Sequence, residues 1–261
     1  VEYEKEQEVD AAQGIIVSIH PRENYIIRKS VKKTGHAHII AANIDQAMLI
    51  ATMTLPRTSY GFIDRFLVAA EAFRIPQVLV FNKIDLLDEK DAHEQSELIK
   101  VYEDIGVTCL EISAREMQGL EAVEKQLDQQ VTLISGHSGV GKSTLLNKLD
   151  PSINQAVKEV STYAEKGVHT TTFAEMFQLN ENTFVIDTPG IKELGLIDTS
   201  QEELSDYFPE MRAIQSECKF YNCSHIHEPK CAVKEAVEAG EIAEKRYNSY
   251  LSMYHEEDTH R

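Results

Sequence analysis

The feature that most constrains the fold of this 261-residue chain is a glycine-rich segment near its middle. Residues 136–144 read GHSGVGKST; they follow the apolar run 131–135 and precede a helix expected to begin at about Lys142. The segment fits the pattern Gly-x-x-x-x-Gly-Lys-Ser/Thr, in which backbone N–H groups at a helix N-terminus wrap a phosphate. The sequence therefore predicts a phosphate-binding loop rather than a plain glycine-rich turn between a strand and a helix.

Every position of this loop is a candidate nucleotide contact. Lys142 is expected to reach the β- and γ-phosphates, which makes it a candidate catalytic residue, and Ser143 is expected to ligate Mg²⁺. The predicted contacts of the loop are Gly136, His137, Ser138, Gly139, Val140, Gly141, Lys142, Ser143 and Thr144.

A second motif predicts which base the site would select. Asn82, Lys83, Ile84 and Asp85 read NKID and follow the apolar strand expected over residues 77–81. A carboxylate at the position of Asp85 can accept both N1–H and the 2-amino group of guanine, whereas adenine offers neither donor. Ser113 and Ala114, at the end of the next expected strand, resemble the loop whose backbone N–H meets guanine O6. Together these segments predict selectivity for GTP.

Two further segments are typical of the switches that sense a γ-phosphate. Residues 187–190 read DTPG at the end of an expected strand, so Asp187 is expected to hold Mg²⁺ through water and the Gly190 N–H to contact the phosphate. Upstream, residues 167–172 read GVHTTT and supply hydroxyls for Mg²⁺. Thr171 is the expected ligand and Thr170 the alternative. Ordinary β-propensity also explains a threonine run before a strand.

The order of these motifs decides the fold class. Strands expected at about 47–53, 77–81, 107–112, 131–135, 172–178 and 183–187 alternate with helical stretches, which predicts an α/β domain with a mostly parallel sheet. The base-reading motif precedes the phosphate loop, whereas it follows that loop in ordinary GTPases. The whole series is a cyclic rotation of the usual order, and accidental matches would not preserve a cyclic order. We therefore predict a circularly permuted P-loop GTPase domain.

Three of the four cysteines crowd together near the C-terminal end. Cys218, Cys223, His225 and Cys231 supply three thiolates and one imidazole, enough for a closed, structural tetrahedral Zn²⁺ site. His227 is the rival imidazole, and free thiols in a helical tail are the alternative interpretation. Cys109 stands apart in an apolar strand and is expected to be a buried core residue.

Composition limits the other classes of function. The chain is 42% hydrophobic and 26% charged, and its longest apolar run is far short of the roughly 20 residues of a membrane helix. No targeting segment is expected from its first residues. A formal net charge of −17 disfavours indiscriminate binding to nucleic acid. One dense basic cluster early in the chain is expected to face either RNA or solvent; it consists of Arg22, Arg28, Lys29, Lys32 and Lys33.

The combination of motifs resembles the ribosome small-subunit-dependent GTPases, the RsgA or YjeQ family. The resemblance spans nearly the whole chain: YIIRKS, HIIAANIDQ, FIDRFL, NKID, SGHSGVGKSTL, G-x-HTTT, DTPGI and the Cys-Cys-His-Cys cluster. It implies an OB-fold barrel, a permuted GTPase domain and a small helical zinc domain. It also implies a cytoplasmic, monomeric enzyme that uses GTP/GDP, Mg²⁺ and Zn²⁺ and acts late in maturation of the small ribosomal subunit, with the subunit and its rRNA as partners.

Applied to this sequence, the resemblance places incomplete OB-fold strands and a linker at 1–34, the permuted GTPase domain at 35–208 and the zinc domain at 209–261. Most of the OB barrel is expected to be absent, and an N-terminal piece to be missing. Val168 stands where many members have Arg or Gln.

The catalytic group is the least determined part of the site. Many GTPases place a glutamine after the glycine of the DTPG motif to orient the attacking water, but this chain has Ile191. His169 lies beside the threonines, and the family resemblance points to the same histidine, so it is our candidate; a solvent-facing loop histidine is the alternative. The rival function is a GTP-dependent switch that docks a protein partner with negligible turnover.

Overall fold

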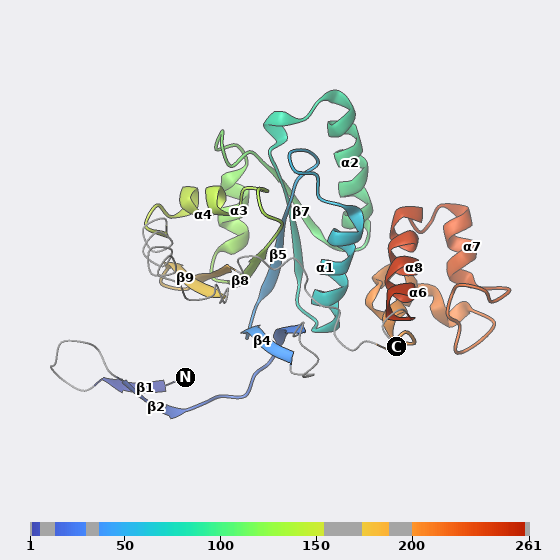
Figure 1. Cartoon of the computed structure of the whole chain (residues 1–261), viewed down its shortest axis with the longest axis horizontal. Coiled ribbons are helices and arrows are strands. Elements are labelled where there is room, and N and C mark those ends of the chain that lie inside the picture. Colours follow the sequence, from blue (N-terminus) through green and yellow to red (C-terminus); the bar gives the residue numbers. More distant parts are fainter. Residues whose placement is uncertain (1, 6–13, 30–36, 154–173, 188–199, 259–261) are drawn as a thin grey trace.

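The computed structural model describes residues 2–5, 14–29, 37–153, 174–187 and 200–258. Figure 1 shows N-terminal strands, a central α/β domain and a C-terminal group of helices that lies beside α1. No helix within these ranges is both long and apolar enough to cross a membrane.

The centre of the molecule is a six-stranded sheet in the order β7-β6-β5-β8-β10-β9. Only β9 runs antiparallel, to β10, and the other neighbours pair in parallel. Strands of a parallel sheet are covered on both faces, which explains why β5 is buried at every position. The bounds are β5 Gln46–Ala51, β6 Gln77–Asn82, β7 Thr108–Ile112, β8 Val131–Ser135, β9 Glu175–Asn180 and β10 Thr183–Asp187. The predicted mostly parallel α/β sheet is confirmed.

Strand order also confirms the permutation. The strand that leads into the glycine-rich loop, β8, lies in the middle of the sheet between β5 and β10. The strands that precede it in the chain fill one side, and those that follow it fill the other. Joining the two ends of this series and cutting before β8 would restore a chain in which the phosphate loop comes first.

Helices cover both faces of the sheet, and the sequence shows why each begins where it does. The hydroxyl of Ser59 accepts a hydrogen bond from the Phe62 N–H at the start of α1, and Asp88 accepts one from the Asp91 N–H at the start of α2. Buried residues of α1 and α2 pack on one face, and those of α3 and α4 on the other. The bounds are α1 Tyr60–Ala72, α2 Glu89–Asp104, α3 Leu120–Leu127 and α4 Lys142–Leu149.

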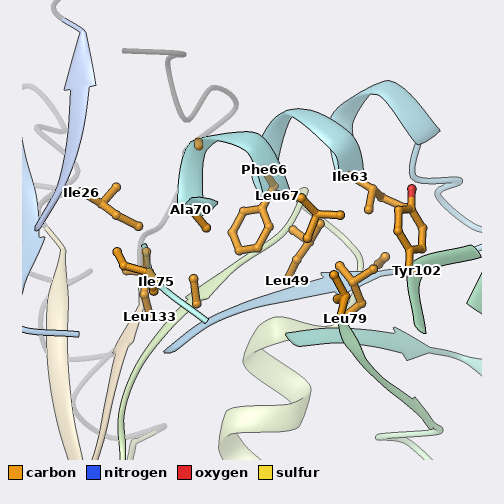
Figure 2. Packing of buried hydrophobic residues seen from close by; sticks show 14 of the residues in the cluster. Ile26, Leu49, Ile63, Phe66, Leu67, Ala70, Ile75, Leu79, Tyr102 and Leu133 are labelled. Carbon is orange, nitrogen blue, oxygen red and sulfur yellow. The ribbon is translucent and has the colours of Figure 1, made fainter. Parts of the chain in front are cut away.

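Figure 2 shows the core beneath α1, where Phe66 lies beside Leu49 of β5 and Ala70 lies above Ile75. These two α1 residues carry the helical periodicity of the sequence and are almost fully buried. Phe62, one turn earlier on the same face, is only half-buried and reaches the phosphate loop.

The N-terminal strands form two separate two-stranded antiparallel sheets, β1 with β2 and β3 with β4. Their bounds are β1 Glu2–Lys5, β2 Gly14–Ser18, β3 Tyr25–Lys29 and β4 Ala37–Ala42. All three of β1, β2 and β3 lie within residues 1–34, where strands were expected, although the acidic sequence of β1 does not itself indicate a strand. Strands β3 and β4 lie in the chain on either side of residue 34, the boundary that the family resemblance implied. The Asn24 side chain fixes this pair to the α/β domain, with hydrogen bonds of 2.8 Å to the backbone N–H and carbonyl of Ile44.

The C-terminal helices have a core of their own that includes one residue of the α/β domain. Leu204, Phe208 and Tyr250 are buried there with Val68 of α1. The elements are the 3₁₀ turns η2 Leu204–Tyr207 and η3 Gln215–Glu217, and the helices α6 Pro209–Ile214, α7 Ala232–Ala239 and α8 Glu244–Asp258. The helical character expected of residues 209–261 is confirmed.

Candidate nucleotide site and metal centre

The amide of Asn82 joins three of the predicted nucleotide-binding segments. Its Nδ2 donates to the Val140 carbonyl in the glycine-rich loop at 2.8 Å, and its Oδ1 accepts from the Ala114 N–H at 3.0 Å. Asn82 is itself 3% exposed at the end of β6. The carboxyl ends of β6, β7 and β8 therefore carry one connected site, as expected for parallel strands of an open sheet.

Glycine is required where these segments meet. Gly141 has a φ of 99°, and a Cβ there would lie 2.3 Å from Asn82 Nδ2. Gly136 has a φ of 145°, and a Cβ there would lie 2.5 Å from the Ile50 carbonyl oxygen. Both positions combine a backbone conformation that favours glycine with contact to the backbone or side chain behind the loop. The two glycines of the motif thus allow the loop to pack against β5 and β6.

Two lysines bind the carbonyls of the glycine-rich loop. Lys83 Nζ donates to the Gly139 carbonyl at 2.7 Å and to that of Leu55. Lys142 Nζ donates to the His137 carbonyl at 3.1 Å and to that of Gly136. A bound phosphate would offer Lys142 a stronger, charged acceptor than these carbonyls.

The electrostatics around Lys142 link the loop to the end of β10. Partial burial lowers the pKa of the Lys142 ammonium, and the charge of Asp187 acts in the opposite direction. The first residue of the predicted DTPG switch thus lies close enough to Lys142 to influence it. This is the arrangement that a Mg²⁺–phosphate complex between the two segments would need.

The remaining described candidates surround these groups. Asp85 is exposed in the 3₁₀ turn η1 Ile84–Leu86, and Ser143 is exposed on the first turn of α4. Ser138, Gly139 and Thr144 are exposed too, whereas Ile84 and His137 are half-buried. The exposed residues Asp85, Ser138, Gly139, Ser143 and Thr144 are therefore accessible to a nucleotide.

The guanine-loop residues are more deeply placed than the motif suggests. Ser113 and Ala114 are fully buried, and the Ser113 hydroxyl accepts from the Glu116 N–H at 3.1 Å. The Ala114 N–H already donates to Asn82. It would therefore have to share this hydrogen with guanine O6, or the N–H of Arg115 would have to donate to O6 instead.

Several predicted site residues lie outside the described residues. They are His169, Thr170, Thr171 and Gly190, with the neighbouring Val168, Thr188, Pro189 and Ile191. Lys32 and Lys33 of the basic cluster lie outside as well.

The four metal-ligand candidates come together, with their sulfur and nitrogen atoms all within 4.8 Å of one another. The Cys218 and Cys231 sulfurs are 3.9 Å apart, and His225 Nδ1 lies 3.6 Å and 3.4 Å from them. Tetrahedral bonds of about 2.3 Å to sulfur and about 2.0–2.1 Å to nitrogen separate sulfurs by about 3.8 Å and sulfur from nitrogen by about 3.6 Å. Cys218, His225 and Cys231 therefore have the spacing of three ligands of a tetrahedral zinc site, and Cys223 lies close enough to be the fourth. His225 is the imidazole of this cluster, while His227 is exposed.

Side chains around the cluster hold its loop in place. Glu228 accepts from the Ser224 N–H and hydroxyl at 2.9 and 2.8 Å, and from the N–H groups of Ile226 and His227 at 3.2 Å each. Partial burial acts to raise the pKa of Glu228, but the hydrogen bonds outweigh it and lower the pKa to about 2. Two tyrosines of α8 bind the same loop, Tyr247 to the His225 carbonyl at 2.6 Å and Tyr250 to the Ser224 carbonyl at 2.7 Å.

Cys109 does not take part in this cluster. It lies half-buried on β7, rather than fully buried as expected, and burial raises the pKa of its thiol to about 12. A thiol with that pKa is protonated at neutral pH and is a poor nucleophile or metal ligand.

A buried ion-pair network, which the sequence patterns did not predict, links α1 to the C-terminal helices. Arg246 of α8 donates to Asp64 of α1 at 2.8 Å and to Glu210 of α6 at 2.7 and 3.1 Å. The Tyr102 hydroxyl of α2 also donates to Asp64, at 3.0 Å. The available signal was an aspartate in the helical segment FIDRFL, between the apolar positions Phe62 and Phe66.

The fold and these sites define a class: a circularly permuted P-loop GTPase with a C-terminal Cys₃His domain. Comparison with known proteins is more specific, because the family model described as RsgA GTPase matches residues 19–197. The chain belongs to this family of GTP hydrolases.

Individual relatives extend the match over most of the chain. It is 52% identical over 249 residues to the small ribosomal subunit biogenesis GTPase RsgA of Cytophaga hutchinsonii, covering 95% of this chain and 81% of that protein. It is 49% identical over 245 residues to RsgA 2 of Bacteroides thetaiotaomicron, covering 94% and 79%.

Solved structures agree with this assignment. YjeQ from Thermotoga maritima has a TM-score of 0.76 and 36% identity, covering 94% of this chain and 79% of that one. YloQ, described as a circularly permuted GTPase, has a TM-score of 0.70 and 29% identity, covering 99% and 91%.

Proposed function

We propose that this protein hydrolyses GTP to GDP and phosphate to assist a late step in maturation of the small ribosomal subunit, and that the subunit stimulates the hydrolysis. The observation that carries the nucleotide part is the Asn82 bridge, which connects the base-reading, guanine and phosphate loops into one site. The subunit part is supported by relatives named small ribosomal subunit biogenesis GTPase. A cytoplasmic, monomeric enzyme would suit this role.

Each group of the site has a proposed task. The glycine-rich loop and Lys142 bind the phosphates, and Ser143, Thr171 and Asp187 hold Mg²⁺, the last through water. Mg²⁺ would neutralise charge on the β- and γ-phosphate oxygens as the bond to the γ-phosphate breaks. A Zn²⁺ ion held by Cys218, Cys223, His225 and Cys231 would serve structure alone, because four protein ligands leave it no open position.

The experiment that tests this function is phosphate release from GTP with and without purified small subunits. Stimulation by the subunit is the expected result. GTP-dependent binding to a partner without added phosphate release would favour the rival switch function instead.

Asp85→Asn is expected to weaken GTP binding by about 2 kcal/mol, or roughly thirtyfold, since the amide accepts fewer of the guanine protons. Xanthine carries a carbonyl where guanine has its amino group, so the variant is expected to tolerate xanthosine triphosphate better than the parent does. Titration with both nucleotides measures the change. Asp88→Asn is a matched control, because Asp88 caps α2 just outside the motif. Unchanged GTP affinity in Asp85→Asn would refute the base-reading role.

His169→Ala is expected to keep GTP affinity but to lose about tenfold or more of the subunit-stimulated rate, the low end for a group that positions water. Single-turnover hydrolysis with saturating subunits is the measurement, and His227→Ala is the control because His227 is exposed beside the metal cluster. If the stimulated rate survives in His169→Ala, the attacking water is positioned by the ribosome.

A further inference from the structure

Two aromatic side chains project from the loop that joins the first two metal-ligand candidates. Phe220 is 39% exposed and Tyr221 is fully exposed, and both lie between Cys218 and Cys223. Neither ring belongs to the core of the C-terminal helices, which is formed by other residues. Large rings bury much apolar area when they find a partner, so two adjacent exposed rings indicate a contact surface.

Positive charge accompanies these rings. Lys219 Nζ lies 5.1 Å from the centre of the Phe220 ring, and the Lys219 N–H donates to the Lys230 carbonyl at 3.2 Å. That backbone bond brings the two exposed lysines together at the base of the loop. Within residues 218–231 the only carboxylate is Glu228, and hydrogen bonds from its own loop engage it. The exposed Glu217 lies just before Cys218.

The loop is held at both ends. Cys218 and Cys223 belong to the Cys₃His cluster, and Tyr247 and Tyr250 hold the chain just after Cys223. A loop that is pinned in this way presents its rings with little entropy left to lose on binding. Exposed rings can stack on the flat face of a nucleotide base, and neighbouring lysines can bind its phosphate by charge.

We propose that Phe220 and Tyr221 form a stacking platform for unpaired bases of RNA, with Lys219 and Lys230 contacting the phosphates. The proposal rests on the proposed function, in which the RNA is that of the small subunit. RNA fits better than a protein partner because the platform combines cationic side chains with protruding rings, on a chain whose net charge is −17. Such a chain has little attraction for RNA except where lysines gather locally.

The absence of tryptophan from the sequence allows a direct test. Tyr221→Trp keeps a stacking ring and introduces a single tryptophan, whose emission is excited apart from that of the tyrosines at long wavelength. We expect its emission to be quenched by a short single-stranded RNA of mixed sequence, in a salt-dependent way, and much less by the same RNA as a duplex. Met176→Trp is the matched control, since Met176 is 54% exposed on β9 and far from the metal cluster in the sequence. Equal quenching of the two variants would overturn the proposal.

The affinity of the protein for single-stranded RNA tests the proposal independently. Tyr221→Ala and Phe220→Ala are each expected to weaken binding of the single-stranded RNA by about fivefold or more, whereas Met176→Ala leaves it unchanged. Basal GTP hydrolysis and bound zinc should match the parent protein in all three, because both rings are exposed and neither residue is among the four metal-ligand candidates or the predicted nucleotide contacts.

RNA binding that is unchanged in both alanine variants would overturn the proposal. So would quenching of Tyr221→Trp by ribosomal proteins stripped of RNA but not by RNA itself, a result that would make the loop a protein-docking surface. Failure of small subunits to stimulate the parent enzyme would count against the proposed function. The RNA titrations test the stacking platform independently of that function.

Discussion

Replacing Arg246 with methionine is expected to lower the free energy of unfolding by about 3–5 kcal/mol, because it leaves buried carboxylates without their cation. The Arg246 and Asp64 side chains are 3% and 1% exposed, and Glu210 is 11% exposed. Arg246, Asp64 and Glu210 belong to three different helices. The substitution is therefore expected to destabilise the junction between α1 and the C-terminal helices. Urea denaturation followed by circular dichroism measures the change.

The chain offers a matched control for this experiment. Arg212 of α6 pairs with Glu71 of α1 at 2.8 Å, across the same junction, but its side chain is 48% exposed. Since solvent screens an exposed pair, Arg212→Met is expected to cost no more than about 1 kcal/mol. Equal effects of the two substitutions would contradict the role given to the buried network. The double variant Asp64→Asn with Arg246→Met should recover part of the loss, because it also removes a stranded charge.

Removing the metal, or replacing Cys231 with serine, is expected to unfold the C-terminal domain. Structural zinc in small domains supplies about 10–16 kcal/mol of apparent binding free energy at neutral pH, far more than the few buried side chains of α6, α7 and α8 can replace. GTP binding should persist, because Asn82, Lys83 and Lys142 belong to strands and loops of the α/β domain.

Three measurements on one sample test this expectation. Elemental analysis should find one zinc per chain, chelation should remove the helical signal of the C-terminal domain, and nucleotide titration should change little. Cys109→Ser is the control, since Cys109 lies on β7 outside the cluster and its replacement should retain the metal. Freshly purified protein without zinc would refute the assignment of the cluster.

Much of the nucleotide site could be predicted from the sequence, for a physical reason. Lys83 and Lys142 lie in short motifs that directly follow apolar strands, and the carboxyl ends of parallel strands meet at one edge of a sheet. The cyclic order of the motifs therefore predicts the order of the strands in the sheet, with β8 in the middle. Local pattern and global fold agree at this edge, so the motifs and the strand order could be predicted together.

The sequence left open what depends on distant contacts. Spacing could not choose between His225 and His227; the fold does, because Tyr247 and Tyr250 of α8 hold the loop so that His225 lies among the sulfurs. The resemblance placed strands within residues 1–34, but no local pattern in residues 2–5 marked β1, which pairs with β2.

The sequence by itself determined the class of protein, its permuted order and the residues expected to bind nucleotide and metal, because each is encoded in a few neighbouring positions. Only the tertiary structure decided how the C-terminal domain is joined to the rest. Arg246 and Asp64 are 182 residues apart in the sequence. An arginine in a polar helix has the sequence pattern of a surface residue, and only the packing of α8 on α1 buries it. Both charges are then removed from water, and each offsets the cost of burying the other by pairing with it.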